Sequence, residues 1–202
     1  MKKALIIGGI IAGVLLLILG LFCLRVAGCY NSIVKKDQAV SSSWAQVQNV
    51  YQRRADLVPN LVATVSGAAN FEKSTIVAVT EARASVGKVQ IDPTKVPTAE
   101  QMQAFQHAQV GLGSALSRLL VVSENYPKLR ATENFRDLQT QLEGTENRIA
   151  VERKNFNDKT QELNSYIKQV ICPLIAARIG GVEPKPYFQA TEGSDKVPTV
   201  KF

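Results

Sequence analysis

Charged and amide side chains interrupt the apolar pattern at several points, and they are the groups through which this chain could do chemistry. They are Arg53, Arg54, Asp56, Asn60, Glu81, Arg83, Glu124, Asn125, Glu146, Asn147 and Arg148. Carboxylates that face inward from several helices bind metal in di-iron bundles, but those sites use a Glu-x-x-His motif on each of two helices. This sequence has no such motif. Interhelical ion pairs that fix helix register are the favoured interpretation, because buried charge needs partners; a ligand or partner site is the alternative.

The sequence offers little for catalysis or for metal binding. The single histidine, His107, has no cysteine or acidic residue in ligand spacing nearby, and one histidine cannot build a histidine-rich zinc site. Gly111 and Gly113 lack the preceding strand and the following Lys-Ser/Thr of a phosphate loop, so we expect them to let two helices approach closely. We therefore predict no catalytic residue, no metal, no cofactor and no enzymatic activity.

The candidate polar groups must be positioned by helices, since apolar residues recur at helical spacing along most of the chain. A first helical stretch is predicted from Tyr30 to about Gly87. Pro59 removes one backbone hydrogen bond inside it, so a kink or short break is expected around Asp56 to Asn60. The proline-containing stretch from residue 88 to residue 99 is predicted to be a loop.

Two further helices are predicted beyond that loop. One runs from Glu100 to Asn125 and stops at Tyr126-Pro127, because the residue before a proline is pushed out of the helical region. The other begins after Thr132 as N-cap and runs to about Arg178, where Gly180-Gly181 ends it. Its apolar residues follow steps of three, four and seven, the seam of a helix bundle or coiled coil. Residues 181–202 contain three prolines and are predicted to be an extended tail, docked through Tyr187 and Phe188.

No stretch shows the alternation or the β-branched runs that strands need. The predicted fold is therefore all-α: an N-terminal transmembrane helix followed by an antiparallel bundle of three to four long helices. The domain organisation expected is a membrane segment over residues 1–29, a bundle over 30–180 and the tail over 181–202.

The membrane segment is predicted from an uncharged run of twenty-one residues, Ala4 to Leu24, which comes after two lysines. As a helix it is roughly 30 Å long, the thickness of a bilayer's hydrocarbon core. It exceeds the usual apolar length of a cleaved signal peptide, which favours a retained anchor. The alternative is a lipoprotein lipidated at Cys29, because Val26-Ala27-Gly28-Cys29 is similar to a lipobox. Arg25, just before that box, argues against this alternative.

Beyond residue 29 the chain has 21 basic and 17 acidic residues, a net charge of +4, which is mild for a protein that binds nucleic acid. Nucleic-acid-binding domains usually gather basic residues on one face, whereas here Lys and Arg alternate with Asp and Glu along the chain. Anionic lipid headgroups are a more plausible partner for basic residues than nucleic acid is, and the candidates to contact them are Lys35, Lys36, Arg53 and Arg54. Cys172 is the only cysteine after residue 29 and is expected to be a small buried hydrophobe.

Several strings resemble the LemA family, in order from Tyr30 to Phe202. They are Tyr30-Asn31, Trp44-Ala45-Gln46-Val47, Gln52-Arg53-Arg54-Ala55-Asp56-Leu57-Val58-Pro59-Asn60-Leu61, Ser123-Glu124-Asn125-Tyr126-Pro127-Lys128-Leu129, Glu143-Gly144-Thr145-Glu146-Asn147-Arg148-Ile149 and the final Pro198-Thr199-Val200-Lys201-Phe202. The resemblance implies an N-terminal transmembrane helix and a helical bundle in a bacterial membrane. It brings no catalytic residues.

The function expected is that of a membrane-anchored interaction or scaffold protein of the bacterial envelope, which self-associates or binds a protein partner. The alternative is a regulatory, ligand-binding or lipid-binding subunit of an envelope enzyme or signalling system. Trp44 and Tyr51, seven residues apart, are candidate partner contacts, although core positions are the more favoured interpretation. We expect a single-pass protein of the inner membrane. The basic residues on the two flanks nearly balance, so the preference for a periplasmic bundle is weak.

Overall fold

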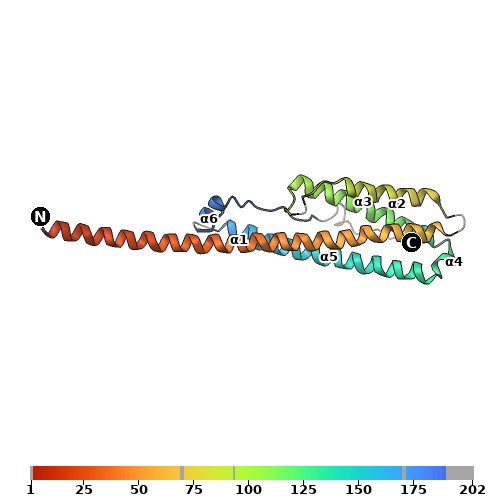
Figure 1. The fold of residues 1–202 in the computed structure, drawn as a ribbon, viewed down its shortest axis with the longest axis horizontal. Coiled ribbons are helices and arrows are strands. Elements are labelled where there is room, and N and C mark those ends of the chain that lie inside the picture. Colours follow the sequence, from red (N-terminus) through yellow and green to blue (C-terminus); the bar gives the residue numbers. More distant parts are fainter. Residues whose placement is uncertain (1, 69–70, 93, 170–171, 190–202) are drawn as a thin grey trace, which may run out of the picture. The chain divides into compact units, whose positions relative to one another are not determined.

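The computed structural model describes residues 2–68, 71–92, 94–169 and 172–189, and over these residues the regular structure is entirely helical (Figure 1). The helices are α1 (Lys2–Ser66), α2 (Lys73–Lys88), α3 (Ala99–Ser123), α4 (Pro127–Arg130), α5 (Glu133–Ile167) and α6 (Cys172–Gly180). The prediction of an all-α fold, with a long apolar N-terminal helix followed by packed helices, is confirmed.

The chain divides into two compact units, which are described separately. We call residues 1–42 and 158–185 the proximal unit, and residues 43–157 and 186–202 the bundle unit. Helices α1 and α5 each contribute to both units. The predicted boundaries of anchor, bundle and tail remain predictions.

The core of the bundle unit comes from the apolar positions that repeat at helical spacing. In α3 the buried residues Phe105, Leu112, Leu116 and Leu119 lie on one stripe, as steps of three, four and seven require. Leu112, Leu116 and Leu119 share a core with residues of α1, α2 and α5, and α2 and α3 pack directly against each other (Figure 1). Trp44 is 1% exposed, which places it in the core.

Of the kink or short break expected around Pro59, the break does not occur, because helix α1 passes through Pro59 uninterrupted. A proline cannot donate to the carbonyl four residues earlier, so Pro59 leaves the Ala55 carbonyl without its helical partner. The Arg83 guanidinium of α2 donates to that oxygen through Nε at 3.1 Å. A neighbouring helix thus replaces the hydrogen bond that the proline removes, and the helix continues to Ser66.

The break in the first predicted helical stretch lies instead between Ser66 and Lys73. The end of α3 at Ser123, before Tyr126-Pro127, agrees with the sequence. Pro127 occupies the first turn of the four-residue helix α4, where its missing N–H costs nothing. At the start of α3, Thr98 and Gln101 form a reciprocal capping box.

The last predicted helix, 133 to 178, is two helices, since α5 ends at Ile167 and α6 begins at Cys172. Pro173 explains the interruption, because its ring would clash with the Gln169 carbonyl in a continuous helix. α6 ends at Gly180, as expected. Gly181 adopts a φ of +63°, and the Val182 N–H donates to the Ala177 carbonyl at 3.0 Å. This is the Schellman closure that glycine permits.

The N-terminal part of α1 carries an exposed apolar surface that includes Ile6, Leu16 and Leu24. Of the helices in the described ranges, α1 is the one long and apolar enough to cross a membrane, and its apolar window is not buried within the protein. A long run of aliphatic side chains that no other part of the protein covers is typical of a segment that lies in lipid.

Candidate functional site

A buried arginine joins three helices of the bundle unit. Arg54 of α1 is 4% exposed, and its Nη2 donates to the Gln109 backbone carbonyl of α3 at 2.9 Å. Its Nε lies 3.1 Å from Oε1 of Glu146 on α5, a distance that allows ion pairing although the angle is poor for a hydrogen bond. The Glu146 side chain is 50% exposed. The charge of Arg54 is therefore compensated at the edge of the core, as buried charge requires.

Gly113 of α3 provides the space for this arginine. A Cβ built on Gly113 would lie 2.8 Å from Nη2 of Arg54, whereas a Cβ on Gly111 would meet nothing within 4 Å. Of the two glycines expected to permit close approach, only Gly113 faces such a contact, and the group that approaches is a side chain.

The other predicted polar residues lie on the surface of the bundle unit and do not gather into one site. Exposed members of the set are Arg53, Asp56, Asn60, Glu81, Arg83, Glu124, Asn125, Asn147 and Arg148. Arg53, Asp56 and Asn60 line a small open cavity of about 300 Å³, where Gln52 donates to Asp56 at 2.7 Å. Arg83 donates to the Ala55 carbonyl beside Pro59. Among the residues described, no group of three or more His, Cys, Asp or Glu side chains could hold a metal ion.

A polar groove of about 1020 Å³ opens beside Arg54 in the bundle unit. Its lining is rich in amides and hydroxyls: Gln103, Gln106, Gln109, Ser114, Ser117 and Gln189, together with His107, Arg153 and Glu146. Gln109 is 4% exposed, and its Oε1 has no hydrogen-bond partner. We call this cavity the glutamine groove. Sequence reasoning missed Gln109, although its place between Phe105 and Leu112 on the buried stripe of α3 was a signal.

Tyr51 lies at the base of the glutamine groove and is 5% exposed. Burial raises its pKa above the ordinary value of about 10, because the phenolate would lose its hydration, and the nearby Arg153 and Arg54 only partly offset this. In the unfolded chain the phenol ionises first as pH rises.

The stability that Tyr51 contributes is thus complete below about pH 10 and decreases above it. We expect the free energy of unfolding of the wild-type protein to fall between pH 9 and pH 11 more steeply than that of Tyr51→Phe. Urea titrations at several pH values would measure the two slopes. Parallel curves would show that Tyr51 is not the group responsible.

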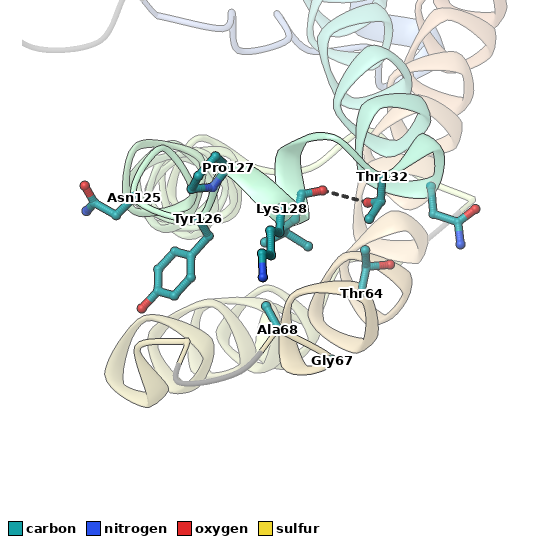
Figure 2. A pocket seen from close by; sticks show the side chains of 10 residues that line it. Thr64, Gly67, Ala68, Asn125, Tyr126, Pro127, Lys128 and Thr132 are labelled. Carbon is teal, nitrogen blue, oxygen red and sulfur yellow. Dashed lines mark hydrogen bonds between the residues drawn. The ribbon is translucent and has the colours of Figure 1, made fainter.

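A third cavity, of about 670 Å³, lies where α1 and α3 end and α5 begins. Figure 2 shows the Lys128 side chain extending towards Ala68, with Tyr126 and Thr64 on either side of it. The Thr132 hydroxyl, predicted to cap α5, donates to the Leu129 carbonyl at 2.7 Å. The cavity is bounded by the Asn125-Tyr126-Pro127-Lys128 string, so this string shapes a surface hollow as well as ending a helix.

Cys29 is disulfide-bonded in this structure, and Cys23 is a free, exposed thiol. The Cys172 side chain lies outside the described part of the chain. A sulfur held in a disulfide is not available for lipidation, so the two states of Cys29 exclude each other. Lipidation at Cys29 remains a prediction.

These features define a class: an all-helical protein whose first helix contains one candidate membrane span and then enters a bundle. The family model for the LemA family matches residues 43–202, and the chain belongs to this family. The matched residues include the whole bundle unit together with α5 and α6, so the resemblance noted in the sequence is confirmed.

Named relatives are distant. The chain is 25% identical over 182 residues to "Magnetosome protein MamQ 2" of Paramagnetospirillum magneticum. The aligned region covers 82% of this chain and 66% of the relative. It is 22% identical over 178 residues to "Protein LemA" of Metamycoplasma hominis, covering 88% of this chain and 76% of that protein. The chain thus spans slightly less than two thirds of the magnetosome relative.

Proposed function

We propose that this protein is a membrane-anchored interaction or scaffold protein of the bacterial envelope that assembles with copies of itself and has no catalytic role. One observation carries the proposal: α1 is a single helix of 65 residues that contains both the exposed apolar run and core residues of the bundle unit. The apolar run and these core residues thus belong to one helix, α1, and this supports a protein in which anchoring and interaction go together.

The polar contacts support an interaction role over catalysis. Arg54 is engaged with Glu146 and Gln109, and Arg83 with the Ala55 carbonyl. These groups hold helices together, and a buried arginine used for helix packing is not available to stabilise a reacting group. The exposed charged residues, such as Arg53 and Arg148, are accessible to a partner.

Orientation with the bundle in the periplasm is part of the proposal. Disulfides persist in oxidising compartments and are rare in the cytosol. The disulfide at Cys29, just after the apolar run, therefore supports export of the part of the chain on the C-terminal side of that run.

Native mass spectrometry of the full-length protein in mild detergent tests the proposal. We expect a chain that retains the apolar run and assembles into one defined oligomer. A matched variant with Leu15, Leu16 and Leu17 replaced by Arg should leave the membrane fraction. A strict monomer over a wide concentration range would contradict self-association, and wild-type protein in the soluble fraction would contradict anchoring.

A second candidate function is ligand binding in the glutamine groove, favoured by the unpaired, buried Oε1 of Gln109. An unpaired buried acceptor costs about 1–3 kcal/mol, and a ligand hydroxyl or amine would remove that cost. Native mass spectra of the wild-type protein would then show a co-purifying small molecule that Gln109→Leu loses. Identical spectra for the two proteins would exclude this role for the groove.

A further inference from the structure

Helix α6 (Cys172–Gly180) belongs to the proximal unit and has two unlike faces. Ala176 is fully buried and Ala177 is 7% exposed. The opposite face carries large apolar side chains: Leu174 is 58% exposed, Ile175 is 37% exposed and Ile179 is 69% exposed. Three large aliphatic residues exposed on a helix of nine residues need an explanation, because single exposed apolar residues are common but clusters mark a binding surface.

The position of α6 on α1 indicates what this face contacts. Both helices line an apolar groove of about 440 Å³, in which Phe22, Val26 and Tyr30 of α1 meet Ile175, Ala176 and Ile179 of α6. A Cβ on Gly180 would lie 3.0 Å from Cε2 of Tyr30, so the end of α6 approaches α1 closely there. α6 therefore lies beside the end of the uncharged run of α1 and the residues just after it, between Phe22 and Asn31.

At this level the exposed face of α6 continues the exposed apolar surface of α1. Phe22 and Leu24 are 44% and 73% exposed on α1. The residues around the two helices are those of a membrane interface: Tyr30 is 41% exposed, and Arg178, Lys35 and Lys168 are exposed basic residues. Aromatic side chains concentrate at the headgroup level, and long basic side chains reach from there towards water and lipid phosphates.

We infer that α6 is a second membrane contact of this protein, an interfacial helix that inserts Leu174, Ile175 and Ile179 into the lipid beside the α1 span. Its exposed apolar face enters the acyl region, and Arg178 stays at headgroup level. The groove between α6 and α1 would accept a lipid acyl chain, since its lining is almost wholly apolar. This inference rests on the membrane anchoring proposed above.

Quenching of tryptophan fluorescence by lipid tests the inference on the full-length protein. The chain has one tryptophan, Trp44, which is 1% exposed and supplies a constant background. Ile179→Trp, Leu16→Trp and Ser165→Trp would each be reconstituted in phosphatidylcholine–phosphatidylglycerol vesicles with brominated acyl chains. All three positions are exposed, so the new ring should not disturb the core. Circular dichroism would check that the helical content is unchanged.

After subtraction of the wild-type signal, we expect bromolipid to quench Ile179→Trp at least threefold more than Ser165→Trp, and to a degree approaching Leu16→Trp. Equal quenching of Ile179→Trp and Ser165→Trp, with Leu16→Trp quenched, would overturn the inference and leave the anchor intact. An unquenched Leu16→Trp would instead overturn the anchoring and the inference with it. Protection of Ile179→Trp from both bromolipid and aqueous acrylamide would assign this face to a protein contact and also overturn the inference.

Discussion

Trp44→Ala is expected to lower the free energy of unfolding by about 3–5 kcal/mol, the range for removing a fully buried large aromatic side chain. The Trp44 ring lies 5.5 Å from that of Phe105, 5.8 Å from Phe156 and 6.1 Å from Phe188, measured between centroids. These partners come from α3, α5 and the extended segment after α6. One substitution therefore opens a cavity where three segments of the bundle unit meet, and they cannot all collapse into it.

Trp44→Phe is the matched control. The buried Nε1 of Trp44 has no hydrogen-bond partner, so phenylalanine removes an unsatisfied donor along with part of the ring. We expect it to cost less than half as much as Trp44→Ala. Urea unfolding followed by circular dichroism would measure both. A small effect of Trp44→Ala, below about 1 kcal/mol, would mean that this aromatic cluster is not a well-packed core.

The docking of the segment after α6 accounts for part of this cluster. Phe188 is 5% exposed, and Asn157 of α5 holds its backbone on both sides: Nδ2 donates to the Phe188 carbonyl at 3.1 Å, and Oδ1 accepts from the Phe188 N–H at 2.9 Å. Arg153 covers the Phe188 ring at 4.9 Å. Of the two residues expected to dock this segment, Phe188 is buried, while Tyr187 is 41% exposed.

The spacing of apolar residues predicted most of the helices, because a helix that buries one face must carry apolar residues every three or four positions. The core positions Val47, Leu116 and Phe156 can be predicted from spacing alone. Helix ends were predicted equally well where Gly181 and Pro127 have local, unambiguous effects.

The failures lie where a distant residue decides a local outcome. Pro59 predicts a kink or a short break, but α1 is not broken there, because Arg83 on another helix donates the hydrogen bond that Pro59 cannot. Nothing in the sequence around Pro59 predicts that pairing. The candidate set contained both members of the Arg54–Glu146 pair, yet nothing in the sequence separated them from the exposed residues around them. Gln109 was missed because an amide side chain is usually exposed, although its spacing from Phe105 and Leu112 places it on the buried stripe of α3.

The arginine site makes the second strong prediction. Arg54→Ala should lower the free energy of unfolding by about 2–3 kcal/mol, because it removes the charged donor that bonds the Gln109 carbonyl in addition to the α3 helical hydrogen bond, and it empties buried volume. Glu146 is half exposed and can be solvated when its partner is removed, so the loss should stay below that for a fully buried pair.

Alanine substitutions at Gly113 and Gly111 test whether Gly113 provides the space that Arg54 occupies. Alanine in a helix interior is more favourable than glycine by about 1 kcal/mol. Gly111→Ala, with open space around its new Cβ, should therefore stabilise the protein by up to about 1 kcal/mol. Gly113→Ala should instead destabilise it by about 1 kcal/mol, since the new methyl group displaces Nη2 of Arg54 from the Gln109 carbonyl at a cost exceeding the gain in helix propensity.

In the Arg54→Ala background the sign for Gly113→Ala should reverse, because the group that the methyl meets is gone. The double-mutant cycle between positions 54 and 113 is then expected to give a coupling energy of about 2 kcal/mol, large for a pair that includes a glycine. Unfolding titrations of the four proteins measure it. If Gly113→Ala proved equally destabilising with and without Arg54, the space at Gly113 would serve the helix backbones, and the arginine would not be the group that the glycine accommodates.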